Sequence, residues 1–282
     1  MELIHTLLFM LRDSEFQQDI EMADQCLKSL EKSMYKTVVV FNQGFWDNET
    51  LKNYLESYQL NCIIIGAGTN VGIVAGRQAC FEYVWGSTDA SYVSELHLDM
   101  IFTDNWEAVL IDYLKKQDNE PMVSCGIVTK TGEMVYLDTT TMPPPNSLDD
   151  MDGYLANIKK DVIVNGFTHP CVHKVDILKE IGGFDTRFLN GKQAFEDDSL
   201  LLGYHYYYGT RANWIPKVNY NSVVCHHTAG QRLGLNDDLM INYNGLVKQY
   251  GAMGVKILSR IHRNPWSITF FTNQFEEMLT SN

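Results

Sequence analysis

Two polar residues near the middle of the chain could bind a metal ion. His97 and Asp99 follow Tyr92–Leu96 (YVSEL), which predicts a strand. Because residues two apart on an extended chain point to the same side, the imidazole and the carboxylate could converge on one cation. The alternative is an ordinary buried strand that ends in two polar residues, since a spacing as short as H-x-D is not specific.

Two further groups of polar residues come later. Glu196, Asp197 and Asp198 open a segment rich in leucine and tyrosine that predicts a helix. One of these carboxylates could act as a general base, or the three could simply face the dipole at the start of the helix. His226 and His227 follow a predicted strand, and adjacent residues on an extended chain point to opposite sides. Only one of these two histidines can therefore serve a given site.

Apolar runs and helical repeats alternate in the first part of the chain. The expected strands are Leu3–Leu11, Thr37–Phe41, Asn61–Ile65 and Tyr92–Leu96, and the expected helices are Ser14–Ser33, Asp47–Tyr58, the segment through Gln78 to Val84, and Trp106–Lys116. This alternation predicts an α/β fold with a Rossmann-like, mainly parallel central sheet and helices on both faces. Ligands of such sheets lie beyond the carboxyl ends of the strands. Asn42, Gly66–Gly72 and His97–Asp99 are expected at that edge.

The pattern changes beyond Lys116. Further strands are expected at Met122–Thr129, Glu133–Leu137, Val162–Phe167 and Asn219–Cys225, with a helix at Val175–Ile181. The first two of these strands would form a hairpin around Thr131-Gly132. Thr141–Asp152 is rich in proline and acid and predicts a mobile loop, long enough to close over a site.

The last part of the chain predicts helices. The tail from Leu239 to Met278 has helical spacing, and Trp266, Phe270 and Phe271 would anchor it by packing. We divide the chain into a main α/β domain of residues 1–230 and a C-terminal helical extension of residues 231–282. With 45% hydrophobic residues, the chain can bury a substantial core.

Charge and cysteine content exclude some classes of function. The net charge of −13 argues against a nucleic acid polymer as partner, because such binding needs basic residues that neutralise phosphates. A nucleotide held through a divalent cation remains compatible with this charge. The six cysteines form no C-x-x-C pair and indicate reduced thiols, so we expect a cytoplasmic protein. The apolar run at the start is too short to span a membrane, and we expect no transmembrane segment.

Five segments resemble, in order, motifs of the family 2 glycosyltransferases, which are inverting enzymes of the GT-A fold. Val38–Leu51 (VVVFNQGFWDNETL) resembles the nucleotide-binding strand and turn, and Asn70–Arg77 (NVGIVAGR) resembles the N-x-G-x-x-x-x-R segment. Tyr92–Met100 resembles the strand that carries the D-x-D metal motif. Ile181–Phe188 (IGGFDTRF) and Phe195–Leu200 (FEDDSL) resemble the G-G-F-D and E-D segments. The resemblance covers about residues 1–230.

The resemblance implies a metal-dependent transferase that moves a sugar from a nucleoside-diphosphate sugar to an acceptor hydroxyl with inversion. A UDP-sugar is the favoured donor, and the acceptor would be a carbohydrate, a lipid-linked molecule or a protein. Mn²⁺ or Mg²⁺ would neutralise the leaving diphosphate. Asp99 and a late histidine, His226 in preference to His227, would hold this ion.

The resemblance also assigns residues to the donor and to the acceptor proton. The donor contacts would be Asn42, Gln43, Asn70, Gly72, Arg77 and His97. By the E-D pattern, Asp197 is the first choice for the general base. Asp198 remains the alternative, because a single added residue would exchange the two. Arg77 could instead be an ordinary solvated residue of a helix.

Two residues depart from the family pattern. His97 stands where the family has the first acid of D-x-D. It could bind the metal, which would favour Mn²⁺ over Mg²⁺, or it could hydrogen-bond the diphosphate as a neutral imidazole. Asn42 stands where the family usually has aspartate. Its amide could still accept a hydrogen bond from a base or ribose, but the loss of charge leaves the base preference open.

Two other classes of function remain open. Gly66-Ala67-Gly68 follows a strand and suggests an NAD(P)-dependent Rossmann oxidoreductase, although the glycine spacing is loose and the strand is the third of the sheet. The incomplete D-x-D motif suggests a non-catalytic protein of GT-A fold that binds sugar-nucleotides or glycans. The aromatic run Tyr204–Tyr208 and Trp214 could stack on sugar rings, but packing is favoured. The oligomeric state, the donor sugar and the acceptor are open.

Overall fold

The computed structural model describes residues 2–208, 213–227 and 236–280. The strands in this part of the chain are β1 (Leu3–Phe9), β2 (Thr37–Asn42), β3 (Asn61–Ile65), β4 (Tyr92–Leu96), β5 (Met100–Ile101), β6 (Met122–Thr129), β7 (Glu133–Met134), β8 (Thr139–Thr140), β9 (Ile163–Asn165), β10 (Cys171–Lys174) and β11 (Lys217–His226). They join into one sheet in the order β3-β2-β1-β4-β10-β6-β11-β5, with β7 attached to β6, β8 to β7 and β9 to β11.

The N-terminal half of the sheet is parallel, as the sequence predicts. β1 is parallel to both β2 and β4, and β2 is parallel to β3. β1 is almost fully buried, as expected of a strand covered on both faces. Because these strands run in one direction, their carboxyl ends meet at one edge of the sheet. Asn42 ends β2 and His97 follows β4 at this edge.

The rest of the sheet is mixed, which corrects the prediction of a mainly parallel sheet. β10 runs antiparallel between β4 and β6, and β5 and β9 are antiparallel to β11. β6 and β11 are parallel, and β6 and β7 form the predicted hairpin. β10 escapes sequence analysis because it has only four residues, and His173 and Lys174 interrupt its apolar pattern.

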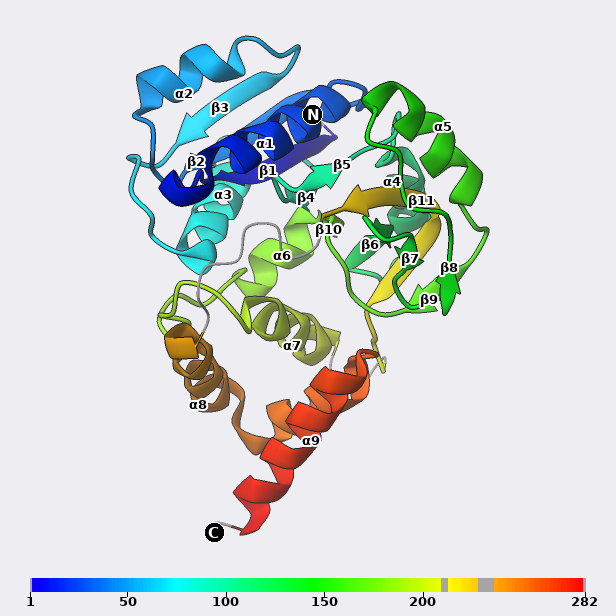
Figure 1. Ribbon diagram of the computed structural model, residues 1–282. Coiled ribbons are helices and arrows are strands. Elements are labelled where there is room, and N and C mark those ends of the chain that lie inside the picture. Colours follow the sequence, from blue (N-terminus) through cyan, green and yellow to red (C-terminus); the bar gives the residue numbers. More distant parts are fainter. Residues whose placement is uncertain (1, 209–212, 228–235, 281–282) are drawn as a thin grey trace.

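Helices cover both faces of the sheet, as predicted (Figure 1). They are α1 (Phe16–Leu30), α2 (Asn48–Leu55), α3 (Ile73–Ser87), α4 (Ala108–Lys116), α5 (Leu148–Ile158), α6 (Val175–Ile181), α7 (Glu196–Tyr208), α8 (Asn236–Ile261) and α9 (Pro265–Thr280). α1, α2 and α4 share one core with the sheet. α3, α6 and α7 share a second core, and α8 and α9 extend this layer: Leu246 and Phe271 belong to the same core as Ile4 of β1. α5 packs on β6 and β11 in a third core. Figure 1 shows α8 and α9 below the sheet, with the C-terminus at the far end of α9.

Two local predictions need correction. The predicted loop Thr141–Asp152 includes the start of α5, because Met151 and Leu155 give this helix a buried apolar face. In the tail, Phe271 is buried as predicted, but Trp266 is 61% exposed and is no buried anchor. The predicted domain boundary between residues 230 and 231 lies outside the described residues.

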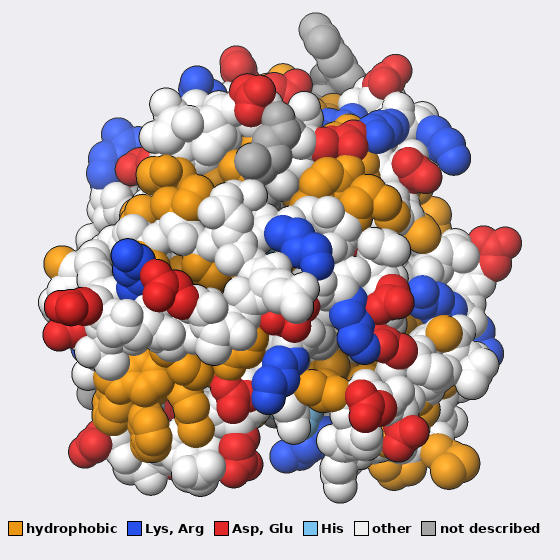
Figure 2. Space-filling view, turned by 90° about the horizontal axis from the view of Figure 1, so that it is seen from above, with side chains coloured by type: hydrophobic (Ala, Val, Ile, Leu, Met, Phe, Trp, Pro, Cys, Tyr) orange, Lys and Arg blue, Asp and Glu red, His pale blue; other side chains and the backbone are white. Residues whose placement is uncertain are grey.

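Charge of both signs is spread over the face seen in Figure 2, where acidic and basic side chains lie among apolar ones. In the whole chain, acidic residues outnumber lysine and arginine by 35 to 22, so the molecule attracts cations more than anions. Among the described helices, none has the length and apolar character needed to cross a membrane.

Candidate functional site

A cavity of about 480 Å³ lies at the carboxyl edge of the parallel strands. Its walls come from the turn after β2, the loop before α3, the residues after β4, the start of α7, the end of β11 and the start of α9. The polar residues and the exposed aromatic on these walls are Gln43, Asn70, Arg77, His97, Asp99, His169, Lys192, Gln193, Glu196, Asp197, Asp198, His226 and Trp266. Together with Gly72, this set contains every candidate residue from the sequence except Asn42 and His227.

His97, Asp99 and His226 form a group in which one ligand atom of each residue lies within 4.8 Å of the others. Nε2 of His226 is 3.2 Å from Oδ1 of Asp99, and Nδ1 of His97 is 4.0 Å from the same oxygen. The N–H of His227 donates to the carbonyl of Asp99 over 2.9 Å and holds the end of β11 in place. His227 therefore positions the group through its backbone, whereas His226 belongs to it through its side chain.

The electrostatics of this group fit a divalent cation. Burial lowers the pKa of His97 well below its usual value, and the neighbouring His169 and Arg77 lower it further. Burial favours the neutral form of Asp99, but the hydrogen bond and the charge from His226 outweigh it, so the pKa of Asp99 is lowered. A neutral imidazole and an ionised carboxylate are the forms that bind a metal. Nδ1 of His226 is buried and has no hydrogen-bond partner among the described residues, whereas Nε2 is the atom that lies next to Asp99.

The acidic residues form the first turn of α7 and line the same cavity. Ala194 and Phe195, just before them, have positive φ angles of 76° and 58°, which is a strained conformation for residues with a side chain. Asn242 of α8 holds this segment, because its amide donates to the carbonyl of Ala194 over 2.8 Å. Asp198 accepts a hydrogen bond from Nε2 of His262 over 2.5 Å. The C-terminal helices therefore shape the acidic wall of the cavity.

The carboxylate of Asp197 differs from that of Asp198 in its partners. Its Oδ1 lies 3.6 Å from Nε2 of His169, beyond hydrogen-bond length, so the carboxylate is less engaged than that of Asp198. Burial raises the pKa of Asp197 well above its usual value, and Glu196 and Glu95 raise it further. Burial likewise raises the pKa of Glu196 to about 7. A carboxylate with a raised pKa is a stronger base toward a hydroxyl proton.

His169 is a site residue that the sequence analysis missed. Its ring lies 4.4 Å from the ring of His97, at an angle of 32°. Its Nε2 is buried on the side of Asp197 and has no hydrogen-bond partner among the described residues. Burial lowers the pKa of His169 well below its usual value. The missing signal was β10. This strand runs antiparallel to β4 with Cys171 opposite Glu95, so His169, two residues before β10, falls beside His97, the residue just after β4.

Asn42 lies inside the turn after β2, not on the cavity wall. It is fully buried and donates to the carbonyl of Trp46 over 3.0 Å and to Oδ1 of Asn48 over 2.7 Å. Its own Oδ1 accepts from the N–H of Gly44 over 3.0 Å. These bonds use both amide donors within the turn. Asn42 therefore shapes the turn through its side chain.

The turn after β2 and the loop before α3 are joined through Gln43. Its Nε2 donates to the carbonyl of Gly72 over 2.8 Å, and its Oε1 accepts from the N–H of Val71 over 2.9 Å. Asn70 accepts from the N–H of Gly72 over 2.9 Å. Gln43, Asn70 and Gly72 thus form one bonded wall of the cavity.

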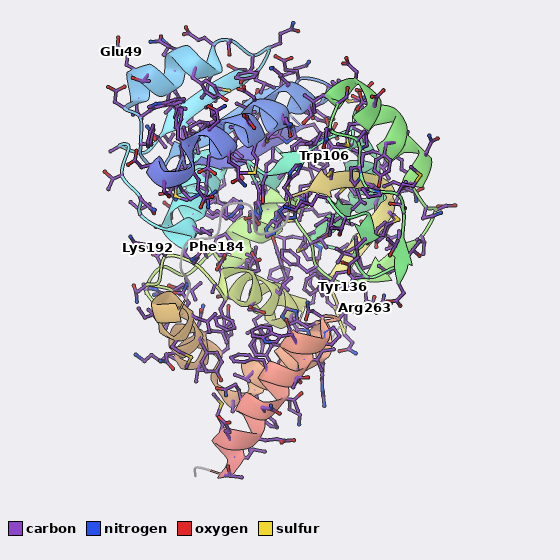
Figure 3. All side chains as sticks on the ribbon, viewed as in Figure 1. Glu49, Trp106, Tyr136, Phe184, Lys192 and Arg263 are labelled. Atoms are coloured by element: carbon purple, nitrogen blue, oxygen red, sulfur yellow. The ribbon has the colours of Figure 1, made fainter. Side chains whose placement is uncertain are left out.

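Gly72 also touches the segment that leads into α7. It has a φ of 87°, and a Cβ there would lie 2.8 Å from Cα of Lys192. The next residue, Ile73, donates its N–H to the carbonyl of Lys192 over 2.6 Å. Figure 3 shows Lys192 beside the start of α3. Only glycine fits this contact, because any side chain would collide with the backbone of the facing segment.

Arg77 lines the cavity but is 4% exposed and already paired. Its Nη1 lies 3.0 Å from Oε2 of Glu95. The other oxygen of Glu95 accepts from Nε2 of His173 over 2.8 Å, and Nδ1 of His173 accepts from the hydroxyl of Tyr204 over 2.8 Å. A contact between Arg77 and a diphosphate would therefore compete with a buried ion pair.

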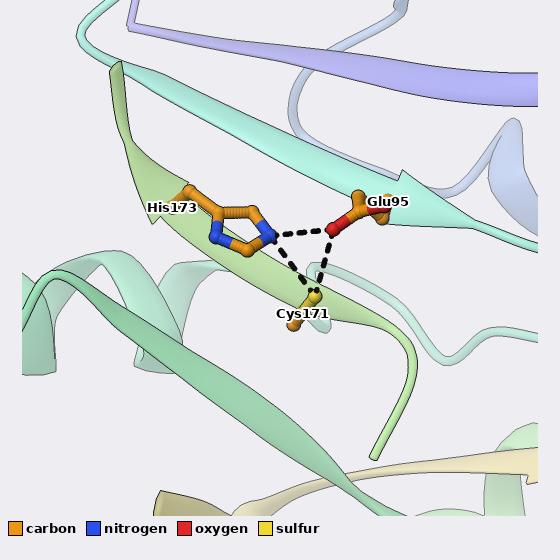
Figure 4. A group of neighbouring side chains, drawn as sticks. All are labelled: Glu95, Cys171 and His173. Atoms are coloured by element: carbon orange, nitrogen blue, oxygen red, sulfur yellow. Dashed lines mark hydrogen bonds and ion pairs between the residues drawn. The ribbon is translucent and has the colours of Figure 1, made fainter. Parts of the chain in front are cut away.

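A second group, Glu95, Cys171 and His173, could hold a metal by position alone (Figure 4). All three side chains are fully buried. Burial raises the pKa of the Cys171 thiol well above its usual value, and the charge of Glu95 raises it further. Cysteine binds metals as thiolate, so a protonated thiol is a poor ligand. This group is a hydrogen-bonded network beneath the cavity.

Comparison with known proteins gives a match at the level of structure. No family model and no curated protein matches the sequence. A crystal structure of S. aureus TarS, residues 1–349, is similar with a TM-score of 0.56 and 12% identity, covering 93% of this chain and 70% of that chain. The same fragment in complex with UDP-GlcNAc gives 0.56 and 12%, covering 93% and 71%. A longer TarS structure gives 0.57 and 13%, covering 93% of this chain and 43% of that one.

TarS is a GT-A-type glycosyltransferase. The fold is GT-A-like.

The loop with Gly66 and Gly68 follows β3, the edge strand of the sheet, whereas a dinucleotide fingerprint follows a central strand. Tyr204 and Trp214 are buried, pack against each other and lie outside the cavity wall, so packing is their role.

Proposed function

We propose that this chain is a metal-dependent, inverting glycosyltransferase of the family 2 type, which moves a sugar from a UDP-sugar to an acceptor hydroxyl. The proposal rests on one observation. A candidate metal-binding group, formed by His97, Asp99 and His226, and the candidate base Asp197 line one cavity in a GT-A-like fold. TarS, which shares this fold, has been solved in complex with UDP and with UDP-GlcNAc, and this supports a UDP-sugar as the donor.

We assign roles to these residues on the basis of their positions. His97, Asp99 and His226 would hold the divalent cation, Mn²⁺ in preference to Mg²⁺, because two of the three ligands are imidazoles. Bound there, the cation would supply positive charge to the leaving diphosphate. Gln43 and Asn70 fix the wall on which the donor rests.

Asp197 takes the proton of the acceptor hydroxyl. The oxygen of that hydroxyl forms a bond to the anomeric carbon of the donor while the bond from this carbon to the diphosphate breaks. UDP leaves with the bonding electron pair. Because the attack comes from the face opposite the leaving group, the configuration at the anomeric carbon inverts.

Binding of UDP with and without Mn²⁺ tests the proposal. In calorimetric titrations we expect Mn²⁺ to strengthen UDP binding by about tenfold or more, a gain of about 1.4 kcal/mol. Asp99→Asn should lose this gain, and removal of the metal with a chelator should bring the unchanged protein to the same level. Asp104→Asn is the matched control, because Asp104 is an exposed acid nearby in sequence and outside the cavity.

Three results would oppose the proposal in different ways. If folded Asp99→Asn still binds UDP in a metal-dependent way, the metal does not bind to the group of His97, Asp99 and His226. Binding of NAD in place of UDP would support the oxidoreductase. Tight, metal-dependent UDP binding without release of UDP from UDP-sugars, even with a broad set of acceptors, would make the chain a sugar-nucleotide-binding protein.

A further inference from the structure

The turn between α8 and α9 brings two residues of the C-terminal helices to the cavity. His262, just after α8, donates to Asp198 over 2.5 Å. Its ring also stacks on Phe271 of α9, with centroids 5.4 Å apart at 17°. Trp266, in the first turn of α9, lines the same cavity as Asp197 and Asp198. The hydrogen bond of His262 therefore fixes this turn against the acidic wall.

The backbone of Trp266 is held rigidly. Oδ1 of Asn264 accepts from the N–H of Trp266 over 2.9 Å and from the N–H of Ser267 over 3.3 Å. Asn264 is thus the cap of α9, and Pro265 occupies the first helical position, where its missing N–H costs nothing. A side chain mounted on a capped helix start presents a fixed surface.

The indole of Trp266 ends a stack of aromatic rings. It lies 5.2 Å from the ring of Phe270 at 10°, and Phe270 lies 5.6 Å from the ring of Phe195 at 26°. Phe195 is buried and directly precedes Glu196, whereas Trp266 is 61% exposed. Stacking on Phe270 covers one face of the indole. The exposed part of a flat aromatic ring is therefore presented at a cavity that also holds carboxylates.

We propose that Trp266 is the platform of an acceptor subsite that takes a pyranose ring of a carbohydrate acceptor. The inference rests on the proposed transferase function and names the class of its acceptor. A pyranose has a face of C–H bonds that packs on the electron-rich face of an indole. It also has hydroxyls around its rim, and Asp197 and Asp198, which line the same cavity, can accept hydrogen bonds from them.

The surroundings of Trp266 favour a sugar over a lipid chain. A lipid chain needs a continuous apolar channel, but the cavity that Trp266 lines contains three adjacent acids and two histidines of the metal-binding group. Burying an alkyl chain against carboxylates would desolvate them without compensation. A sugar instead offers an apolar face and hydrogen-bond donors in one rigid ring.

The test follows the indole N–H signals of the full chain by NMR. The chain has five tryptophans, and Trp266→Phe assigns the signal of Trp266. Cellotriose, chitotriose and maltotriose are the probes, each titrated with and without UDP and Mn²⁺. We expect at least one of them to shift the Trp266 signal saturably. The variants lack this signal, so calorimetric titration measures their binding of the same probe. Trp266→Ala should weaken that binding by about tenfold, Trp266→Phe should weaken it less, and both should leave UDP affinity unchanged.

Tyr207→Ala is the control, because Tyr207 is an exposed aromatic outside the cavity and its loss should not affect the probes. The proposal is overturned if no probe shifts the Trp266 signal in a protein that binds UDP. It is equally overturned if Trp266→Ala binds the probe as the unchanged protein does, or if its only effect is to dissociate a dimer in sedimentation. Failure of the proposed function is a separate result, because it shows as the lack of metal-dependent UDP binding.

Discussion

The three adjacent acids at the start of α7 differ in their surroundings. Asp198 is engaged by His262, and Oε2 of Glu196 is buried with no hydrogen-bond partner among the described residues. Asp197 lies 3.6 Å from His169 and faces the cavity that holds the metal-binding group. A general base must be free to accept a proton, so these surroundings support our proposal of Asp197 over Asp198 for that role.

Substitution of Asp197 should separate catalysis from donor binding. We expect Asp197→Asn to lower the rate of sugar transfer by about a hundred- to ten-thousandfold, because the amide cannot take the acceptor proton. UDP affinity should stay within a few-fold, since the metal-binding group is untouched. Asp198→Asn should have a milder effect, through loss of the bond to His262. Full activity of Asp197→Asn beside an inactive Asp198→Asn would move the role by one residue.

Glu196 should make stability depend on pH. Burial raises its pKa from 4.5 to about 7, so the ionised form costs more in the folded protein than in the unfolded chain. The free energy of unfolding should therefore fall, relative to that of Glu196→Gln, as the pH rises from about 5 to about 8. The shift corresponds to at most about 3 kcal/mol.

Urea unfolding at both ends of this pH range measures the effect of Glu196. Glu49→Gln is the control, since Glu49 is exposed at the outer end of the molecule (Figure 3) and its loss should leave the difference between the two pH values unchanged. If the free energy of unfolding changes with pH in the same way for the wild type and Glu196→Gln, the carboxyl of Glu196 is not held in the neutral form.

Sequence alone could predict part of the site. The sequence pattern H-x-D predicts that His97 and Asp99 converge, and the structure brings them together with His226. The expected extended chain is wrong, because β4 ends at Leu96 and Asp99 lies in the turn before β5. The burial of Asn42 could not be predicted, because it depends on Trp46 and Asn48 folding back over the turn. His169 reaches the site through strand pairing between residues far apart in the chain, and no local pattern reports such pairing.

At the scale of elements, β4 and β10 carry a buried network beneath the cavity. Glu95 accepts from His173 of β10 and pairs with Arg77 of α3, and all of these side chains are buried. The network compensates the charge of Arg77 inside the protein. It also joins α3, which follows the loop with Asn70 and Gly72, to β4, the strand that leads to His97.

Loss of Glu95 should be costly for this reason. We expect Glu95→Gln to lower the free energy of unfolding by about 3–5 kcal/mol, because the guanidinium of Arg77 is left buried without a counter-charge. Glu82→Gln is the matched control: Glu82 is exposed on α3, and its loss should cost less than about 0.5 kcal/mol. Equal stability of the two variants in urea unfolding would mean that water reaches Arg77.

Elements with a strong periodic pattern could be predicted, and elements set by tertiary contacts could not. The bounds of β3, β4 and α6 agree with those expected from the sequence. β10 is too short to show a pattern, and its place between β4 and β6 is what makes the sheet mixed. The start of α5 was hidden by the prolines and acids before it, although Met151 and Leu155 mark its buried face.

At the scale of the whole molecule, the C-terminal helices belong to the core that supports the site. Leu246 and Leu258 of α8 share a core with Ile4 of β1, and Asn242 holds the strained segment before α7. α8 thus supports the acidic wall of the site and shares the core of the sheet, although the five segments that resemble family motifs all precede it in the chain.

Gly245→Ala tests this dependence. A Cβ at Gly245 would lie 1.9 Å from the carbonyl oxygen of Phe188, so α8 would have to move away from the segment that leads to the acids. We expect a loss of about 1–3 kcal/mol in the free energy of unfolding, together with slower sugar transfer. Gly86→Ala is the control, since it adds a methyl group in open space on α3 and should stabilise the helix by about 0.5–1 kcal/mol. An early, separate unfolding step in Gly245→Ala would mean that α8 folds independently.

The contact between Gly72 and Lys192 has a consequence for engineering. It ties the wall that would carry the donor to the segment that would carry the acceptor base, through a backbone hydrogen bond and a position that admits only glycine. A graft that replaces one of these two segments with that of another protein would leave an unmatched backbone surface on the other. To change the donor or the acceptor by loop exchange, the two segments must be transplanted as a pair.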